Sequence, residues 1–237
     1  MKVLAIDTVT EACSVALLDG QEILQEFQVS PNGHSTLVLQ MVENILSRSQ
    51  YQLGDMDVLA VDTGPGSFTG VRIGLGVAQG LAYGADLPVI GVNSMETLAA
   101  SLDSGQVFPA IDARMNQVYC GLYQSCGSSR PVELVQPVVT NPGEWPFEIE
   151  GAFYGIGNGW GIHEEAMGSS VNPSDLTILD HPYPEAKSVA RIAGLIGMES
   201  AMEPMFLQAT YVRNRVANEE VLRNQPKTSQ MESGLNE

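Results

Sequence analysis

The chain has 237 residues, of which 44% are apolar, and 11 basic against 28 acidic residues give it a formal net charge of −17. This size and composition fit one large domain or two lobes with a real core. The charge excludes a protein that binds nucleic acid tightly by itself, because such proteins neutralise phosphates with Lys and Arg. Three cysteines without a CxxC pair favour reduced thiols in the cytosol, and Asp7 argues against a secretory leader.

The first stretch of the chain predicts three strands followed by a helix. Residues 2–8, 12–18 and 22–29 run apolar or alternate, and polar turns separate them, which is typical of antiparallel neighbours. Residues 35–49 then predict a helix whose apolar stripe is wider than one core-facing side needs. This excess width indicates that the helix meets more than its own sheet.

Residues 58–84 are the most unusual stretch. A short apolar strand enters a Gly-Pro-Gly turn and then a helix that is apolar almost all round, yet too short for a membrane span and interrupted by Arg72. Glycine costs a helix interior about 1 kcal/mol relative to alanine, so its repetition indicates close packing. The small residues form two rows spaced by four: Gly70, Gly74 and Ala78, and Gly76, Gly80 and Gly84. We expect a sheet against one side of the helix and a second protein against the other.

The chain begins the same pattern again near residue 108. Ala5-Ile6-Asp7 is echoed by Ala110-Ile111-Asp112, and the glycine-rich residues 153–161 parallel the earlier glycine turn. The repeat predicts an α/β fold of two lobes, each with a mixed sheet flanked by helices. The expected divisions are a first lobe over 1–105, ending in a strand at 87–92 and a helix at 93–102; a second lobe over 106–207, ending in an apolar helix at 186–198; a helix over 208–224 that returns to the first lobe; and a loose polar tail over 225–237.

Motifs for phosphate chemistry are incomplete. The turn at 64–70 has glycines before a helix, as anion sites do, but no Lys follows as in a Walker loop, and Thr69 stands where a dinucleotide motif needs its third glycine. A tight turn with close packing is the better interpretation. A small ATPase or phosphotransferase that uses Asp7 and the glycine loops, including residues 155–161, stays open as an alternative.

Other catalytic groups are scattered. Asp7 and Asp112 each end a strand at the head of a lobe, where a lone carboxylate is more often a turn former than a ligand. His34, His163 and His181 form no metal-binding pair, and no G-x-S-x-G elbow is present. A peptidase is therefore the least favoured function.

Four segments carry a resemblance to a known family: GPGSFTGVRIGL at 64–75, GVNSM at 91–95, AIDARMNQVY at 110–119 and YVR at 211–213. Together they resemble the TsaB family, formerly YeaZ, of bacterial proteins that take part in tRNA threonylcarbamoyladenosine synthesis. The resemblance implies a two-lobed, actin-like ATPase (ribonuclease H-like) fold. It also implies two partners, the related transferase TsaD and the ATPase TsaE.

The resemblance also implies that catalytic groups have been lost. TsaD-like chains carry a metal-binding H-M-E-G-H segment after the glycine helix and the next strand. Here the corresponding run places Ser94 and Leu98 at the two histidine positions, and leucine cannot coordinate a metal. We therefore expect a non-catalytic paralogue with no metal and no cofactor of its own, working in the cytoplasm.

The resulting hypothesis is a partner interface built from both apolar helices. They would pair with the same helices of TsaD, or with a second copy of the chain when TsaD is absent, and tight tRNA binding would be left to the partners. The plain alternative is that both helices are covered by their own sheet. The residues expected at the interface are Leu37, Met41, Ile45, Gly70, Val71, Gly74, Leu75 and Ala78.

Overall fold

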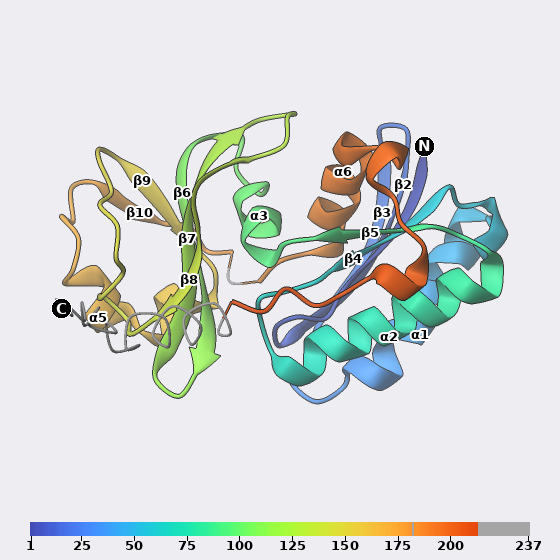
Figure 1. The fold of residues 1–237 in the computed structure, drawn as a ribbon, viewed down its shortest axis with the longest axis horizontal. Helices are drawn as coiled ribbons and strands as arrows, with labels where there is room; N and C mark the ends of the chain where they lie inside the picture. The colour runs from blue at the N-terminus through green and yellow to red at the C-terminus, as the bar shows by residue number, and fades with distance from the viewer. Residues whose placement is uncertain (182, 213–237) are drawn as a thin grey trace, which may run out of the picture.

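The computed structural model describes residues 1–181 and 183–212, which form two lobes, each centred on a five-stranded sheet (Figure 1). This arrangement confirms the predicted α/β fold. The first sheet has the order β3-β2-β1-β4-β5, and the second has the order β10-β9-β6-β7-β8. The strands of the first sheet are β1 (Lys2–Asp7), β2 (Ala12–Asp19), β3 (Glu22–Val29), β4 (Val58–Asp62) and β5 (Val89–Val92). Those of the second are β6 (Ser104–Arg114), β7 (Gln117–Cys126), β8 (Val132–Thr140), β9 (Phe153–Ile156) and β10 (Leu176–Ile178).

The two sheets repeat one topology. In each, three consecutive strands pair antiparallel, and two further strands then add in parallel on the other side of the first strand. β1 and β4 run side by side with Ile6 opposite Val61, so both strands end at the same edge. Because the carboxyl ends of parallel strands meet there, Asp7 and Asp62 become neighbours.

The first sheet is covered on both faces. Leu4 and Ile6 of β1 point toward α1 (His34–Ser49) and α2 (Phe68–Ala85), while Val3 and Ala5 point toward α6 (Ala186–Ile196). Alternate residues of a strand face opposite sides of the sheet, so a strand covered on both faces reads as a continuous apolar run. This explains why residues 2–7 show no alternation.

Two helices each pack on the opposite lobe from the one that their position in the chain predicted. The short α3 (Ser94–Ala99) buries Met95 and Leu98 against Ile111 and Ile156 of the second sheet, whereas α6 packs on the first sheet. The expected divisions at 1–105 and 106–207 are therefore wrong for these two helices, which exchange lobes. An apolar helix face has no mark that names its sheet, so only the packing could assign it. The other face of the second sheet carries α4 (Asn158–Ile162) and α5 (Glu164–Gly168) around Trp160.

The last described residues form an extended strap rather than a helix. Short 3-10 turns at Met198–Ser200 and Pro204–Phe206 precede it, and a third such turn lies at Leu53–Asp55. The Thr210 amide donates to the Thr63 carbonyl over 2.9 Å, and the Arg72 guanidinium donates to the Tyr211 hydroxyl over 2.7 Å. Val212 is buried beside Val139 of the second lobe. The helix expected over 208–224 is thus wrong for 208–212, because the Thr210 amide and the Tyr211 hydroxyl bond to the first lobe instead. Residues 213–224 and the tail over 225–237 lie outside the described residues.

The described part of the chain contains no helix that is both long enough and apolar enough to cross a membrane.

Candidate functional site

The glycine helix α2 turns its first row of small residues toward its own lobe. The Thr8 hydroxyl donates to the Gly70 carbonyl over 2.7 Å, and a Cβ on Gly74 would lie 2.6 Å from the Thr8 Oγ1. Such contacts leave no room for a side chain. Val71, Leu75 and Ala78 on the same side belong to the core beneath α2. The expectation that these five residues meet a partner is therefore corrected: they hold α2 against the first sheet.

The helix α1 buries most of its apolar residues in the same core. Met41 and Ile45 are buried against the sheet, while Leu37 is only half-buried at the margin of the core. Met41 and Ile45 are thus also corrected from interface to core residues. Leu37 remains available to a neighbouring protein.

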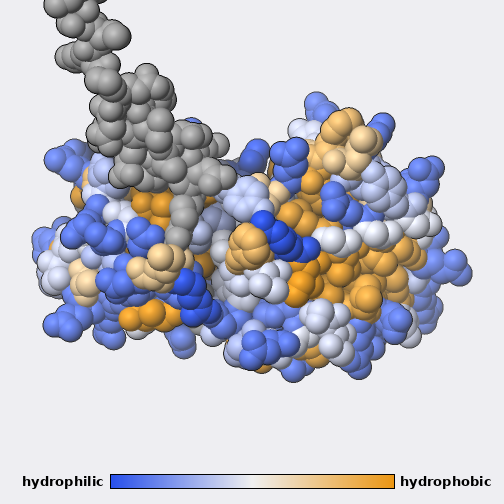
Figure 2. All heavy atoms as spheres, turned by 60° about the horizontal axis from the view of Figure 1, so that its bottom comes forward, coloured by the Kyte–Doolittle hydropathy of each residue, from blue (hydrophilic) through white to orange (hydrophobic). Residues whose placement is uncertain are grey.

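The second glycine row of α2 faces solvent. A Cβ on Gly76, Gly80 or Gly84 would meet nothing within 4 Å, so the helix backbone is open along this row. Figure 2 shows a wide apolar area over the lobe that carries α1 and α2. The exposed and half-buried apolar side chains that α1 and α2 contribute are Leu37, Leu39, Leu46, Phe68, Ile73, Val77, Leu81 and Tyr83. We call these residues except Leu37, with the three glycines, the open helix face; Leu37 shares the side of α1 on which Asn44 and Arg48 bond to Glu26 of β3.

Periodicity explains why the sequence pointed to the wrong residues. Both glycine rows have the same spacing of four, so either could have faced the sheet. The sequence predicted a sheet on one side of α2, and the structure confirms that half of the expectation. The open helix face has no cover from the described part of the chain at Gly76, Gly80 and Gly84.

The two positions that resemble a lost histidine pair are filled by other interactions. The Ser94 hydroxyl donates to Asp62 Oδ1 over 2.5 Å, and Leu98 is fully buried in the core of the second lobe. Within 1–181 and 183–212, no cluster of three or more His, Cys, Asp or Glu residues is arranged as a metal site. Ser94 and Leu98 thus serve packing and hydrogen bonding in this chain.

Asp7 and Asp62 form a buried carboxyl pair at the ends of β1 and β4. Each is 1% exposed, and each has one carboxyl oxygen, Oδ2, without a hydrogen-bond partner among the described groups. Burial and the neighbouring Asp62 carboxylate raise the pKa of Asp7 well above its usual range. Burial also raises the pKa of Asp62 to about 6, although Ser94 and the Gly64 amide oppose the shift. Burial therefore favours the protonated form of Asp7, and it also opposes ionisation of Asp62 below about pH 6.

We expect Asp62→Asn to stabilise the fold above neutral pH. Because the folded-state pKa of Asp62 is raised from 3.8 to about 6, its contribution to stability is full below about pH 4 and is lost as the pH rises through about 6. An uncharged amide removes this loss and should add about 3 kcal/mol to the free energy of unfolding at pH 8. Urea unfolding from about pH 4 to about pH 8 measures it, with Asp103→Asn on the surface as the control. Parallel pH curves for Asp62→Asn and the unmodified chain would contradict the raised pKa of Asp62.

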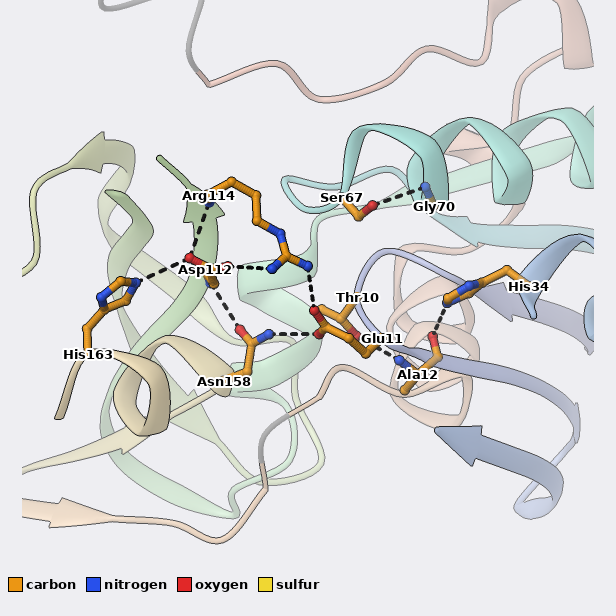
Figure 3. Close-up of polar contacts among 10 residues, drawn as sticks. All are labelled: Thr10, Glu11, Ala12, His34, Ser67, Gly70, Asp112, Arg114, Asn158 and His163. Carbon is orange, nitrogen blue, oxygen red and sulfur yellow. Dashed lines mark hydrogen bonds and ion pairs between the residues drawn. The ribbon is translucent and has the colours of Figure 1, made fainter. Parts of the chain in front are cut away.

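A polar network joins the lobes at the turn between β1 and β2 (Figure 3). Glu11 accepts from Arg114 over 2.8 Å and from Asn158 over 3.0 Å, and Asp112 pairs with Arg114 and with His163. The network lies beside a cavity of about 430 Å³ between the first turns of α1 and α2. These residues come from three distant stretches of the chain, so no sequence motif predicted the network. The Arg114 guanidinium in this network already pairs with the carboxylates of Glu11 and Asp112.

The glycine loops near this junction are filled by the protein itself. A Cβ on Gly155 would lie 2.7 Å from the Trp160 ring, and Cβ atoms on Gly157 and Gly159 would meet Ala110. At the other loop, a Cβ on Gly66 would meet the Val9 backbone. These glycines allow close packing, as predicted for the turn at 64–70.

The three histidines occupy three separate environments. His34 begins α1, one residue before the predicted start, and its Nε2 lies 3.1 Å from the Ala12 carbonyl. His181 Nε2 lies 3.2 Å from the Ser101 hydroxyl and 3.4 Å from a Glu185 oxygen. A catalytic triad needs the carboxylate on one ring nitrogen and the serine on the other. Here both partners meet the same nitrogen, so this arrangement is not a triad.

Comparison with known proteins gives consistent similarities. The sequence model of the TsaD family, described as tRNA N6-adenosine threonylcarbamoyltransferase, matches residues 27–229. The tRNA threonylcarbamoyladenosine biosynthesis protein TsaB of Escherichia coli (strain K12) is 37% identical over 231 residues, which are 92% of this chain and 96% of that protein. The protein of the same name from Haemophilus influenzae is 32% identical and is covered to 95%.

Solved structures agree with these relatives. The structure of YeaZ from Pseudomonas aeruginosa matches with a TM-score of 0.80 at 33% identity, covering 89% of this chain and 99% of that one. A second structure, described as an uncharacterized protein with similarity to peptidase YEAZ from Pseudomonas aeruginosa, matches with the same TM-score at 34% identity, covering 90% of this chain and 99% of that one.

Proposed function

Because the chain belongs to the TsaB family, also called YeaZ, whose members are named for tRNA threonylcarbamoyladenosine biosynthesis, we propose that it is a non-catalytic subunit in that synthesis. In this proposal it binds the transferase TsaD and, together with TsaE, supports the transfer reaction carried out by TsaD. The proposed role is a cytoplasmic one, since transfer RNA is the substrate of the pathway.

One observation carries the proposal: the open helix face. A surface with half-buried Ile73, Val77 and Leu81 around bare helix backbone at Gly76 and Gly80 is what two closely packed helices need. Helices usually pack with their axes 8–10 Å apart, and small residues at the contact favour the lower end of this range. Contiguous apolar surface of this kind marks interaction sites on soluble proteins.

The match to the TsaD family model supports that partner in particular. A chain built on the same pattern presents related helices, and related surfaces pair readily about a pseudo-two-fold axis. The same geometry allows a second copy of this chain to cover the face when TsaD is absent. The net charge of −17 also fits the proposal, because the partners, and not this chain, would make the contacts with tRNA phosphates.

The alternative of a small ATPase or phosphotransferase meets three obstacles at the lobe junction. Asp7 is buried and hydrogen-bonded to the Val9 amide, Arg114 already pairs with Glu11 and Asp112, and the glycine loops pack against protein atoms. A nucleotide phosphate would have to displace these contacts. The peptidase alternative lacks a serine and a carboxylate on opposite nitrogens of a histidine within the described residues.

The test is threonylcarbamoylation of tRNA reconstituted from purified components, with each one omitted in turn. We expect the chain to be required beside TsaD and TsaE, and the chain alone to show neither transfer nor ATP hydrolysis. ATP turnover by the isolated chain would favour the alternative function. Full activity in its absence would refute the proposal.

A further inference from the structure

The second lobe ends in an outer strand that is only partly covered. β10 pairs in parallel with β9, and no described strand lies on its other side. In an outer strand, every second backbone N–H and C=O faces away from the sheet. Two large apolar side chains are exposed here: Ile178 of β10 is 48% exposed, and Ile162 at the end of α4 is 54% exposed.

A groove runs between this strand and the helices beside it. Its cavity has a volume of about 850 Å³, and its lining includes Ile162, Glu164, Glu165, Leu176 and Ile178. The two isoleucines also line an adjoining cavity of about 460 Å³ that reaches Asp180 and the lobe junction. Leu176 and Ile178 are two apart in the strand, so they share one face of the sheet and form an apolar floor. We call this feature the β10 groove. It lies at the end of the molecule opposite α1 and α2 (Figure 1).

The charges around the β10 groove have one sign. Glu164, Glu165 and Asp180 line it, and neither cavity has a Lys or Arg among its lining residues. Glu164 and Glu165 are exposed and form no ion pair with any residue of the described part of the chain. Complementarity therefore calls for a ligand with apolar groups for the floor and positive charges for the rim.

We propose that the β10 groove binds a basic, extended segment of a partner protein, which lies along β10 as an added strand. Alternate residues of such a segment would place apolar side chains on Ile162 and Ile178 and direct Lys or Arg toward Glu164 and Glu165, while its backbone bonds to the free edge. A second copy of this chain fits poorly, because it would bring the same carboxylates together. The proposal is independent of the TsaD contact, which uses the other lobe.

The experiment uses the full chain and a short fluorescein-labelled peptide that alternates lysine with valine, followed by fluorescence anisotropy. We expect saturable binding, and the double variant Glu164→Lys/Glu165→Lys should weaken it by about tenfold or more. The matched control is Glu199→Lys/Glu203→Lys, which makes the same charge change at exposed carboxylates outside both cavities. It should change the affinity by less than about twofold.

Two further comparisons separate strand addition from simple charge attraction. A peptide of the same sequence that is N-methylated at alternate residues keeps its charge but cannot donate to β10, and we expect it to lose binding. Ile178→Asp should also abolish binding while the circular dichroism spectrum stays unchanged. Equal weakening by both double variants, equal binding of the N-methylated peptide, equivalent competition by the polyamine spermidine, or the absence of saturable binding would each overturn the proposal.

Discussion

Gly80→Leu is expected to weaken association with TsaD strongly while leaving the isolated chain folded. A side chain at position 80 meets nothing within 4 Å in the monomer, so the lobe has no reason to unfold. In the proposed complex, however, the leucine would stand where two helices approach most closely. Overpacking at such a point costs about 1–3 kcal/mol, which corresponds to a loss of affinity of about 5- to 150-fold.

The measurement is co-purification with TsaD, followed by a titration that gives the dissociation constant. Gly54→Leu is the matched control, because it is the same substitution at an exposed glycine with equally open surroundings that belongs neither to the open helix face nor to the β10 groove. Gly80→Ala adds a graded step: alanine should raise the stability of the free chain by about 0.5–1 kcal/mol and still weaken the complex. Unchanged affinity for TsaD in Gly80→Leu would show that the open helix face is not the contact.

Gly74→Leu is expected to do the opposite: it should damage the fold before any partner is considered. A Cβ at position 74 would lie 2.6 Å from the Thr8 hydroxyl, which is held in place by its hydrogen bond to the Gly70 carbonyl. The strand end and the helix must separate to admit the side chain, at a cost of about 3 kcal/mol or more. For a chain of this size we expect the melting temperature to fall by about 10 °C.

A double-mutant cycle tests the cause of that loss. Gly74→Ala should destabilise the chain, and Thr8→Ala should remove most of the penalty, because the hydroxyl that the new methyl group meets is then gone. Urea unfolding of the four proteins gives the coupling free energy. If the two changes simply add, the close contact with Thr8 is not what requires glycine at position 74.

Several features of the fold could be predicted from the sequence because they depend on local chemistry. Polar turns between apolar strands, and the return of Ala-Ile-Asp near residue 110, indicated two lobes of the same topology. The glycine content of α2 indicated close packing, which the structure confirms on the side of α2 that faces the first sheet. The replacement of a histidine pair by Ser94 and Leu98 could be read directly, because a metal ligand is a property of the residue type.

The candidate site was predicted less well than the fold. Of the residues expected to meet a partner, Leu37 lies at the margin of the exposed surface. Met41, Ile45 and the row from Gly70 to Ala78 are buried on the sides of α1 and α2 that face the sheet. The buried pair of Asp7 and Asp62 and the network around Glu11 were not predicted. Their members are far apart in the chain, and only the parallel register of β1 with β4 and the meeting of the two lobes bring them together.

The sequence by itself determined the first three strands, the helices α1 and α2, the duplicated α/β pattern and the absence of the histidine pair from its expected place. The tertiary structure alone decided which glycine row of α2 is covered, which sheet α3 and α6 cover, and where residues 208–212 go. The physical reason is that hydrophobic periodicity defines the faces of an element but not what each face packs against. The two glycine rows of α2 have the same period and the same chemistry. The row of Gly70 and Gly74 packs against Thr8, and the row of Gly76, Gly80 and Gly84 is therefore left exposed.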